Sequence, residues 1–399
     1  MSQNKSRRIA IFTGSRAEYG LFKPIISEIS EHPLLHPLLL VAGSHLDESL
    51  GSTIREIEAD GFEISSRLLT PSIEKNRSFT SRAIGLTINA VTDWLAKNEP
   101  DLMLIYADRF ESFAALIAST QMNIPTAHIE GGDKTEGGAL DDSVRHAMTK
   151  LAHIHFPTNL DSANRIRSMG EEEFRIHNVG FGVIDLIMGG DFATLEEIQI
   201  EFPIVQDKPI VLFTLHSITT SPELAVVQIQ ECLKAIKNLI EMEFQVIATY
   251  ANADLGGEII NENLEQFAKQ SLPNFHLRKS LGRYMYHGIL ALGLNKNWRV
   301  VCLGNSSSGI KETPALKCPT VNIGSRQKGR LRGGNVIDSV CESESIIDAV
   351  VNRALSEEFR ETCDLVSNPY FCGGAGKQIA EIISRIPLDE KLLVKKMEI

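Results

Sequence analysis

The sequence has no long hydrophobic run, and this absence argues against a membrane protein. Its longest apolar runs, such as residues 38–42, have the length of a buried strand, whereas a membrane-spanning helix needs about 20 apolar residues. Residues 1–8 are polar and basic, and strand-like residues follow them in place of a cleavage site, so no signal peptide is predicted. We therefore expect a cytoplasmic protein without a membrane partner.

Cysteine is scarce as well. The six cysteines all lie from Cys232 onward, and no two of them have the CxxC spacing of a zinc site. A disulfide framework, which is typical of short secreted chains, is not indicated either. We expect these residues to be buried, small, apolar side chains in a reducing compartment.

Basic residues are outnumbered, with 40 Lys and Arg against 51 Asp and Glu and a formal net charge of −11. Nucleic-acid binding requires a basic surface, so no nucleic-acid partner is expected. A single small anion held by a few local arginines is compatible with this charge. A GxGxxG fingerprint is absent, which disfavours a dinucleotide, and residues 373–377 imitate a P-loop without its Ser/Thr or its preceding strand.

What is present is an alternation of short apolar segments with amphipathic ones. Hydrophobic residues make up 43% and charged residues 23% of a 399-residue chain, which is a globular composition and a length that suits two domains. Short apolar segments between turn residues predict buried parallel strands, and the order of the segments predicts doubly wound α/β sheets. Strands are expected at 9–12, 38–42, 101–106, 124–129, 210–214, 244–249, 274–277, 298–303 and 320–323. Helices are expected at 21–30, 49–60, 79–98, 110–121, 222–242, 257–270, 311–316, 343–355 and 376–385.

The alternation weakens between residues 185 and 208, where we place the domain boundary. Residues 1–185 are predicted to form an N-terminal Rossmann-like domain and residues 208–374 a C-terminal one. Residues 375–399 are predicted to hold a last helix that returns to the first domain. Two Rossmann-like domains that face a cleft make the architecture of the B-type glycosyltransferases.

Polar residues follow the carboxyl ends of the N-terminal strands, where open α/β sheets bind ligands. The turn at residues 13–20 is typical of a backbone anion site, to which Arg16 would add a charged fork, although a plain turn with a surface arginine fits equally. Asp108 and Arg109 follow the strand at 101–106, and a catalytic role and a helix-capping role for Asp108 have about even weight.

The strand at 124–129 is followed by a more specific pattern. Strand alternation predicts that His128 and Glu130 point to the same side, and a buried carboxylate beside a histidine is costly unless it is paired or working. His153 and His155 would share a face of a short strand. Without a third spaced ligand a structural role is favoured for them, and no metal is predicted.

The C-terminal half carries its clearest signal after the strand at 298–303. Ser306 and Ser307 open a turn that would surround a diphosphate, and Glu312 could accept both hydroxyls of a ribose; an N-capped helix with an incidental glutamate is the alternative. Arg326, in a basic glycine-rich loop, would either close over phosphates or be solvated. His216 lies at the tip of the strand at 210–214, where a catalytic role is only modestly favoured.

Taken together, these segments resemble one family, the hydrolysing UDP-N-acetylglucosamine 2-epimerases that open sialic-acid biosynthesis. The resemblance extends from Arg8 to Arg385. It is carried by residues 14–20 (GSRAEYG), 43–46 (GSHL), 108–110 (DRF), 128–132 (HIEGG), 141–146 (DDSVRH), 215–216 (LH), 305–309 (NSSSG) and 326–330 (RQKGR). One departure is Ala107, because the family usually has glycine before the Asp-Arg pair.

The resemblance implies that UDP-N-acetylglucosamine is cleaved to N-acetylmannosamine and UDP, through elimination to a 2-acetamidoglucal and hydration, with no metal or nicotinamide cofactor. The acid–base set that it implies is Asp108, Glu130, Asp141 and His216. The UDP- and substrate-binding residues that it implies are Arg16, His45, Arg109, Arg145, Ser306, Ser307, Glu312 and Arg326. The family also implies a homodimer or a homotetramer.

Alternative functions remain open at this point. The same reaction on UDP-N,N′-diacetylbacillosamine would belong to legionaminic-acid synthesis, and a non-hydrolysing 2-epimerase would keep UDP attached to the sugar. A glycosyltransferase would pass the sugar to an acceptor. A non-enzymatic nucleotide-sugar sensor leaves the inward carboxylates and His216 unexplained.

Overall fold

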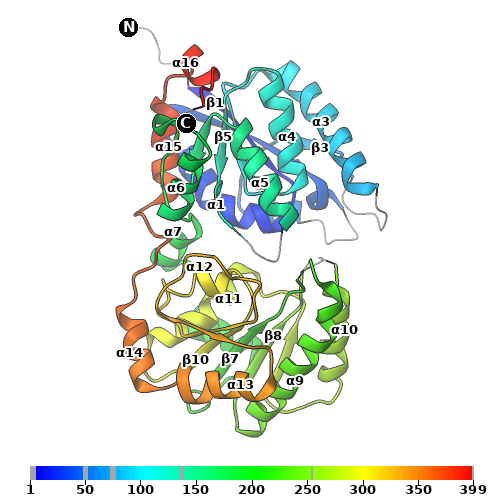
Figure 1. The fold of residues 1–399 in the computed structure, drawn as a ribbon, viewed down its shortest axis with the longest axis vertical. Coiled ribbons are helices and arrows are strands. Elements are labelled where there is room, and N and C mark those ends of the chain that lie inside the picture. The colour runs from blue at the N-terminus through cyan, green and yellow to red at the C-terminus, as the bar shows by residue number, and fades with distance from the viewer. Residues whose placement is uncertain are drawn as a thin grey trace. The chain divides into compact units, whose positions relative to one another are not determined.

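The computed structural model describes residues 6–47, 53–71, 78–134, 139–218, 220–252 and 255–397. The chain divides into two compact units, each built on a six-stranded, all-parallel sheet (Figure 1). The first unit contains the chain up to Lys134, Leu140–Asp185 and the segment from Tyr370 onward, and the second is mainly Leu186–Pro369. The predicted fold class, two doubly wound α/β domains, is confirmed.

The sheet of the first unit has the strand order β3-β2-β1-β4-β5-β6. Its strands are β1 (Arg7–Thr13), β2 (Leu35–Ala42), β3 (Ile64–Leu68), β4 (Leu102–Tyr106), β5 (Thr126–Ile129) and β6 (Ile154–Phe156). Its helices are α1 (Arg16–Glu31), α2 (Ile54–Ala59), α3 (Phe79–Asn98), α4 (Phe110–Gln121), α5 (Ala139–Leu151), α6 (Leu160–Ser168), α15 (Ala375–Arg385) and α16 (Glu390–Leu393). The chain winds outward in both directions from the neighbours β1 and β4, so the ends of these two strands form the switch point at which such sheets bind ligands.

Helix α15 packs against α1 within the first unit. A Cβ atom at Gly376 would lie 2.8 Å from the carbonyl oxygen of Pro24, so only glycine permits this approach. The guanidinium of Arg7 on β1 donates hydrogen bonds to the carbonyl oxygens of Ile383 (2.6 Å) and Ile386 (2.8 Å). These contacts attach the C-terminal segment to the strand and helix that begin the unit.

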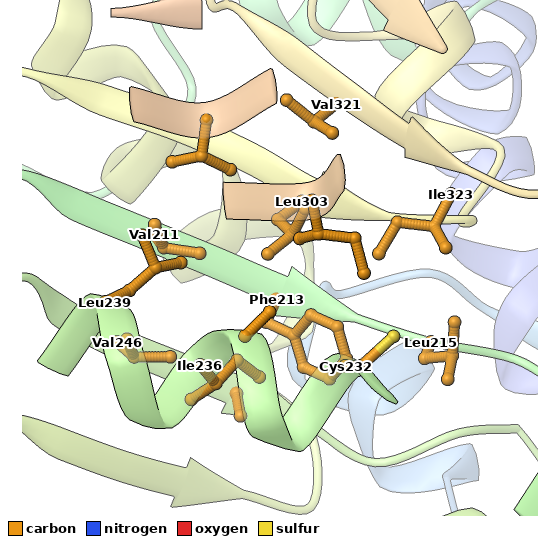
Figure 2. Packing of buried hydrophobic residues seen from close by; sticks show 14 of the residues in the cluster. Val211, Phe213, Leu215, Cys232, Ile236, Leu239, Val246, Leu303, Val321 and Ile323 are labelled. Atoms are coloured by element: carbon orange, nitrogen blue, oxygen red, sulfur yellow. The ribbon is translucent and has the colours of Figure 1, made fainter. Parts of the chain in front are cut away.

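The sheet of the second unit has the order β12-β11-β10-β7-β8-β9. Its strands are β7 (Ile210–Thr214), β8 (Gln245–Thr249), β9 (Phe275–Arg278), β10 (Val300–Gly304), β11 (Thr320–Ile323) and β12 (Val336–Ser339). Its helices include α8 (Leu195–Glu201), α9 (Ala225–Glu241), α10 (Gly257–Ala268), α11 (Gly282–Ala291), α12 (Ser308–Lys311), α13 (Ser343–Asp348) and α14 (Glu357–Leu365), and α7 (Val183–Met188) precedes them at the boundary. Phe213 and Leu303 of the sheet and Ile236 and Leu239 of α9 belong to its buried core (Figure 2).

The structure differs from the predicted elements at several places. Strands β3 and β12 were not predicted, because they lie at sheet edges, alternate in burial and carry polar residues. Helices α8, α11 and α14 were also missed, although Thr194 and Glu197 form a capping box, a readable start signal for α8. The helix predicted at 311–316 is wrong: α12 ends at Lys311, and Pro314 cannot continue a helical hydrogen-bond ladder. Residues 49–52 of the helix predicted at 49–60 lie outside the described residues.

The cysteine prediction needs one correction. All six cysteines are free thiols, and four of them are buried, but Cys341 is partly exposed and Cys372 is exposed. No helix in the described part of the chain combines the length and the apolar character that crossing a bilayer requires.

Candidate active site

Asp108, directly after β4, forms a largely buried ion pair with Arg145 of α5. The guanidinium of Arg145 is 5% exposed and the carboxylate of Asp108 is 18% exposed. Burial alone lowers the pKa of Arg145, but the nearby carboxylates of Asp108, Asp133 and Glu130 outweigh it and raise that pKa above its usual value. The sheet edge therefore carries a permanent positive charge that holds a carboxylate against it.

The backbone that presents Asp108 has an unusual conformation. Ala107 has a φ of +53°, in the left-handed region that L-residues adopt at a cost of about 1–2 kcal/mol. The amide of Ala107 donates to the carbonyl of Ile129 (3.0 Å), and its own carbonyl accepts a 2.7 Å hydrogen bond from Nε2 of His128. Because a carbonyl only accepts, Nε2 carries the proton, and burial lowers the pKa of His128 to about 3. A neutral, buried histidine thus holds the strained residue that precedes Asp108.

Glu130 also has a left-handed backbone, with a φ of +66°. The strand alternation from which His128 and Glu130 were predicted to point to the same side does not extend to Glu130, because β5 ends at Ile129. Glu130 is 6% exposed, and its amide donates to the carbonyl of Phe156 at 2.9 Å. The ends of β4 and β5 thus each present a carboxylate: Asp108 directly after a left-handed residue, and Glu130 with left-handed backbone itself.

The turn after β1 is built differently from the predicted anion site. The amide of Gly14 donates to the carboxylate of Glu18 at 2.9 Å, and Ser15 caps the helix by accepting from the amide of Glu18 at 3.5 Å. The Gly14 amide is thus used within the turn instead of facing a ligand. Arg16 is the first residue of α1, and its side chain lies outside the described part of the structure.

The partly exposed Arg109 pairs with a buried carboxylate behind this turn. Its guanidinium donates to both oxygens of Glu111, at 2.9 and 3.1 Å, and Glu111 is fully buried. Glu18 accepts a hydrogen bond from Ser112, and burial raises the pKa of Glu18 to about 7 although Arg109 opposes the shift. A Cβ atom at Gly14 would lie 2.8 Å from Cβ of Glu111, so the glycine makes room for this carboxylate. Glu18 and Glu111 were missed as site residues, although Glu111 lies on the otherwise small or apolar buried face of α4.

His45 lies in the same region and is fully buried. Its Nε2 lies 3.0 Å from Oγ1 of Thr13, and its Nδ1 lies 2.8 Å from Oγ1 of Thr53. Burial lowers the pKa of His45 to about 4, so the ring is neutral. Both ring nitrogens have protein partners, which ties the ends of β1 and β2 to the start of α2.

Asp141 lies on the first turn of α5 and is exposed, four residues before Arg145 and hence on the same face of the helix. Asp142, which the sequence analysis did not select, approaches the Arg145 guanidinium at 3.4 Å. Helix α5 thus brings acidic residues and one arginine to the edge where Asp108 lies.

The histidines near β6 take part in an internal network. Nε2 of His155 lies 3.0 Å from the carboxylate of Glu171, which also pairs with Lys150 and, at 2.7 Å, with Lys395. Nδ1 of His153 accepts from the amide of Thr126 at 3.1 Å. Within the described residues, no group of three or more His, Cys, Asp or Glu side chains is arranged to hold a metal ion.

In the second unit, Asn305 connects the ends of β7 and β10. Its side chain accepts from the amide of His216 (2.7 Å) and donates to the carbonyl of the same residue (2.8 Å). The approach is close because a Cβ atom at Gly304 would lie 1.9 Å from the carbonyl oxygen of Thr214. The backbone carbonyl of Asn305 accepts from Arg326 (3.1 Å) and Gln327 (2.8 Å), so Arg326 is brought to this edge.

The ring of His216 has a defined hydrogen-bonding pattern. Its Nδ1 accepts from the amide of Asn252 at 3.1 Å, which leaves the proton of the neutral imidazole on Nε2. Burial, together with the charge of Arg326, lowers the pKa of His216 to about 3. His216 is thus neutral near pH 7 and offers an N–H group rather than a basic nitrogen.

The serines and Glu312 lie around the short helix α12. The hydroxyls of Ser306 and Ser308 are 2.9 Å apart, and Ser307 occupies the position before the first residue of α12. The carboxylate of Glu312, which is 13% exposed, meets Nε2 of His287 at 2.7 Å. Asn305, Gln327 and His287 were not selected from the sequence as site residues, because their role depends on partners from other elements.

Comparisons with known proteins place this geometry in context. Residues 27–384 match the family described as UDP-N-acetylglucosamine 2-epimerase. The chain is 32% identical over 389 residues to the "UDP-N,N'-diacetylbacillosamine 2-epimerase (hydrolyzing)" of Legionella pneumophila, with 98% of each chain covered. It is 31% identical to the "GDP/UDP-N,N'-diacetylbacillosamine 2-epimerase (hydrolyzing)" of Campylobacter jejuni, with 89% of each chain covered. The crystal structure of a UDP-GlcNAc 2-epimerase from Neisseria meningitidis has a similar fold, with a TM-score of 0.78 at 21% identity over 94% of this chain and 99% of that one.

Proposed function

The chain belongs to the UDP-N-acetylglucosamine 2-epimerase family, and on this premise we propose that it is a hydrolysing 2-epimerase that releases UDP and an epimerised 2-acetamido sugar. The observation that carries the proposal is the Asp108–Arg145 pair at the carboxyl end of β4. Removal of the C2 proton of such a sugar needs a positioned base, and the ion pair with Arg145 orients the Asp108 carboxylate.

The proposed reaction first breaks the C2–H bond and the C1–O bond, and then forms C2 again with the opposite configuration. The base removes the C2 proton, the C1–O bond to UDP breaks, and a 2-acetamidoglucal results. Water then adds across the double bond, with hydroxyl at C1 and a proton returned to C2 from the opposite face. Asp108, Glu130 and Asp141 are proposed to handle these protons. Asp108 and Glu130 follow the carboxyl ends of the neighbouring strands β4 and β5, and Asp141 lies on α5 one turn before Arg145, the partner of Asp108.

His216 is proposed to act as a hydrogen-bond donor instead of a base. Because its Nδ1 accepts from Asn252, its Nε2–H is directed away from that contact and can stabilise negative charge on the departing diphosphate. Arg16 and Arg326 are proposed to neutralise the phosphates, with the hydroxyls of Ser306 and Ser307 as further donors. Glu312 is proposed to accept the ribose hydroxyls.

Arg109 and His45 are proposed to act at one remove from the substrate. The guanidinium of Arg109 is occupied by both oxygens of Glu111, and the ring of His45 by Thr13 and Thr53. We assign to them the support of the turn that presents Arg16 and of the backbone that presents Asp108.

The proposed sugar is N-acetylglucosamine, and N,N′-diacetylbacillosamine is the second candidate. N,N′-Diacetylbacillosamine is a candidate because it appears in the names of the relatives from Legionella pneumophila and Campylobacter jejuni, at 32% and 31% identity. A UDP-N-acetylglucosamine 2-epimerase from Neisseria meningitidis serogroup B is 30% identical over 346 residues. Comparing kcat/KM for the two UDP-sugars with the purified protein decides between them.

The reaction is tested by turnover in heavy water without any acceptor. We expect free UDP and a 2-epimeric sugar that carries one deuterium at C2, detected by mass spectrometry and proton NMR. A glycosyltransferase or a simple hydrolase would leave C2 protonated and its configuration unchanged. A non-hydrolysing epimerase would place deuterium on a sugar still bonded to UDP. Either outcome would refute the proposal.

A further inference from the structure

Helix α11 supplies two consecutive side chains to the region where nucleotide binding is proposed. The hydroxyl of Tyr286 accepts a 3.2 Å hydrogen bond from Ser308, and Nε2 of His287 contacts Oε2 of Glu312 at 2.7 Å. Neither residue belongs to a motif that the sequence analysis selected. Helix α11 thus supports both the serine turn and the glutamate that follows it.

In the hydrogen bond between His287 and Glu312, the histidine is the donor. A carboxylate oxygen only accepts, so the proton lies on Nε2 of His287. The ring is 1% exposed, and Nδ1 is buried without a hydrogen-bond partner among the described residues. Nε2–H is therefore the hydrogen-bond donor that this buried ring directs at Glu312.

This donor restricts the Glu312 side chain, which otherwise rotates about three bonds. Glu312 follows the four-residue helix α12 directly, so regular helical structure does not hold it on its C-terminal side. With Oε2 held by His287, the carboxylate has one fixed orientation, and its remaining lone pairs are available at a partly exposed surface.

We propose that His287 is a positioning residue that orients the Glu312 carboxylate to accept the two hydroxyls of the nucleotide ribose. The inference rests on the proposed function, in which Glu312 binds that ribose. His287 acts through Glu312 and touches no substrate atom in this scheme. Its effect is therefore confined to ligands that carry the hydroxyls.

The position of α11 does not depend on this contact. A Cβ atom at Gly288 would lie 2.5 Å from the carbonyl oxygen of Ala193, so the helix is packed closely against that segment. The amide of Ala193 also donates to the carbonyl of Tyr284 at 3.1 Å. A leucine of similar size at position 287 therefore removes the hydrogen bond while the packing of α11 remains.

The test measures how strongly the protein discriminates UDP from 2′,3′-dideoxy-UDP, which lacks both ribose hydroxyls, by isothermal titration calorimetry. The variants are His287→Leu, which removes the donor, and His287→Gln, whose amide nitrogen replaces Nε2. The matched control is His276→Leu on β9, since that ring packs on Phe202 and not on Glu312. The wild type is expected to bind UDP at least about tenfold more tightly than 2′,3′-dideoxy-UDP, because the hydrogen bonds of both hydroxyls to a charged group are lost.

His287→Leu should weaken UDP binding about tenfold or more and leave 2′,3′-dideoxy-UDP binding nearly unchanged, so that the discrimination disappears. His287→Gln and His276→Leu should both retain it. Equal weakening of both nucleotides in His287→Leu, or no change in either, would overturn the inference. A wild type that binds UDP without discrimination would also overturn it while the deuterium assay still supports the reaction. A wild type that releases no UDP in that assay would contradict the proposed function itself.

Discussion

The carbonyl oxygen of Ala107 accepts a 2.7 Å hydrogen bond from Nε2 of His128, and this bond stabilises a left-handed alanine directly before Asp108. An L-residue at a φ of +53° has a conformational cost that glycine would not have. His128 and the ladder bond from Ala107 to Ile129 hold the conformation nonetheless.

Ala107→Gly should therefore not destabilise the protein. Relief of left-handed strain is worth about 1–2 kcal/mol, and the added freedom of glycine in the unfolded chain costs about 0.4–1 kcal/mol. The unfolding free energy from urea denaturation should remain equal or rise by up to about 1 kcal/mol. Ala147→Gly, at an exposed position of α5, is the control and should lower it by about 1 kcal/mol. Similar losses in both variants would show that Ala107 is not strained.

Glu18 should make stability depend on pH in a defined direction. Burial raises the pKa of Glu18 from 4.5 to about 7 in the folded protein, so the folded state binds the extra proton between these values. The stabilising contribution is complete below the unfolded pKa and is lost as the pH rises through about 7.

Glu18→Gln isolates this effect, because the buried histidines titrate equally in both proteins. The midpoint temperature of the wild type relative to Glu18→Gln should fall as the pH is raised from about 5 to 8, with a change on the order of 2–4 kcal/mol in unfolding free energy. A difference between the two proteins that stays constant over this range would contradict a raised pKa at Glu18.

Asp108 and Arg145 should act as one unit in turnover. Asp108→Asn is expected to lower kcat/KM by about 10²–10⁴-fold, as is typical for loss of an acid–base group. Arg145→Met should also lower it, and the double variant should lose much less than the product of the two single losses, because each change disables the same pair. Arg167→Met is the matched control, since Arg167 pairs with Glu173 at an exposed site and should change little. A loss in the double variant equal to the product of the two single losses would show that Asp108 and Arg145 act independently.

His216 should increase the rate of turnover, but its protonation should not contribute to the pH dependence of kcat/KM. Burial and Arg326 lower the pKa of His216 to about 3, so its ring stays neutral across the pH range of the assay. His216→Gln should lower kcat for UDP release, yet the shape of the kcat/KM profile between about pH 5 and pH 8 should match that of the wild type. Disappearance of an acidic or basic limb in the variant would assign His216 a titrating role.

Chelation should leave the activity intact. In the proposed mechanism the leaving diphosphate is neutralised by Arg16 and Arg326, and the histidines near β6 are engaged in protein contacts. UDP release after exhaustive dialysis against a chelator should equal that of the untreated enzyme. Loss of activity that one added divalent cation restores would contradict this prediction and implicate a metal.

The sequence by itself determined the class of fold and the bounds of its central elements. Segments such as Leu102–Tyr106 and Ile210–Thr214, which are apolar apart from Thr214, are the buried central strands that their pattern predicts, and the helices Phe79–Asn98 and Phe110–Gln121 have the predicted bounds. A strand that is buried on both faces is easy to recognise in a sequence, because nearly all of its positions are apolar. Edge strands such as β3 are hard to predict from sequence, because they pair through backbone groups that all residues share.

The tertiary structure alone decided which partner each polar group has. Asp108 meets Arg145, which lies 37 positions along the chain, and His216 receives the amide of Asn252, which lies 36 positions along the chain. The charge of Arg109 is paired with Glu111. Strand β5, which contains His128, ends before Glu130, because Glu130 has a left-handed backbone. Hydrophobic periodicity records only which side of an element is buried. Ion pairs, tautomers and left-handed residues depend on which strand ends become neighbours in the sheet, and that order is set by the packing of the whole domain.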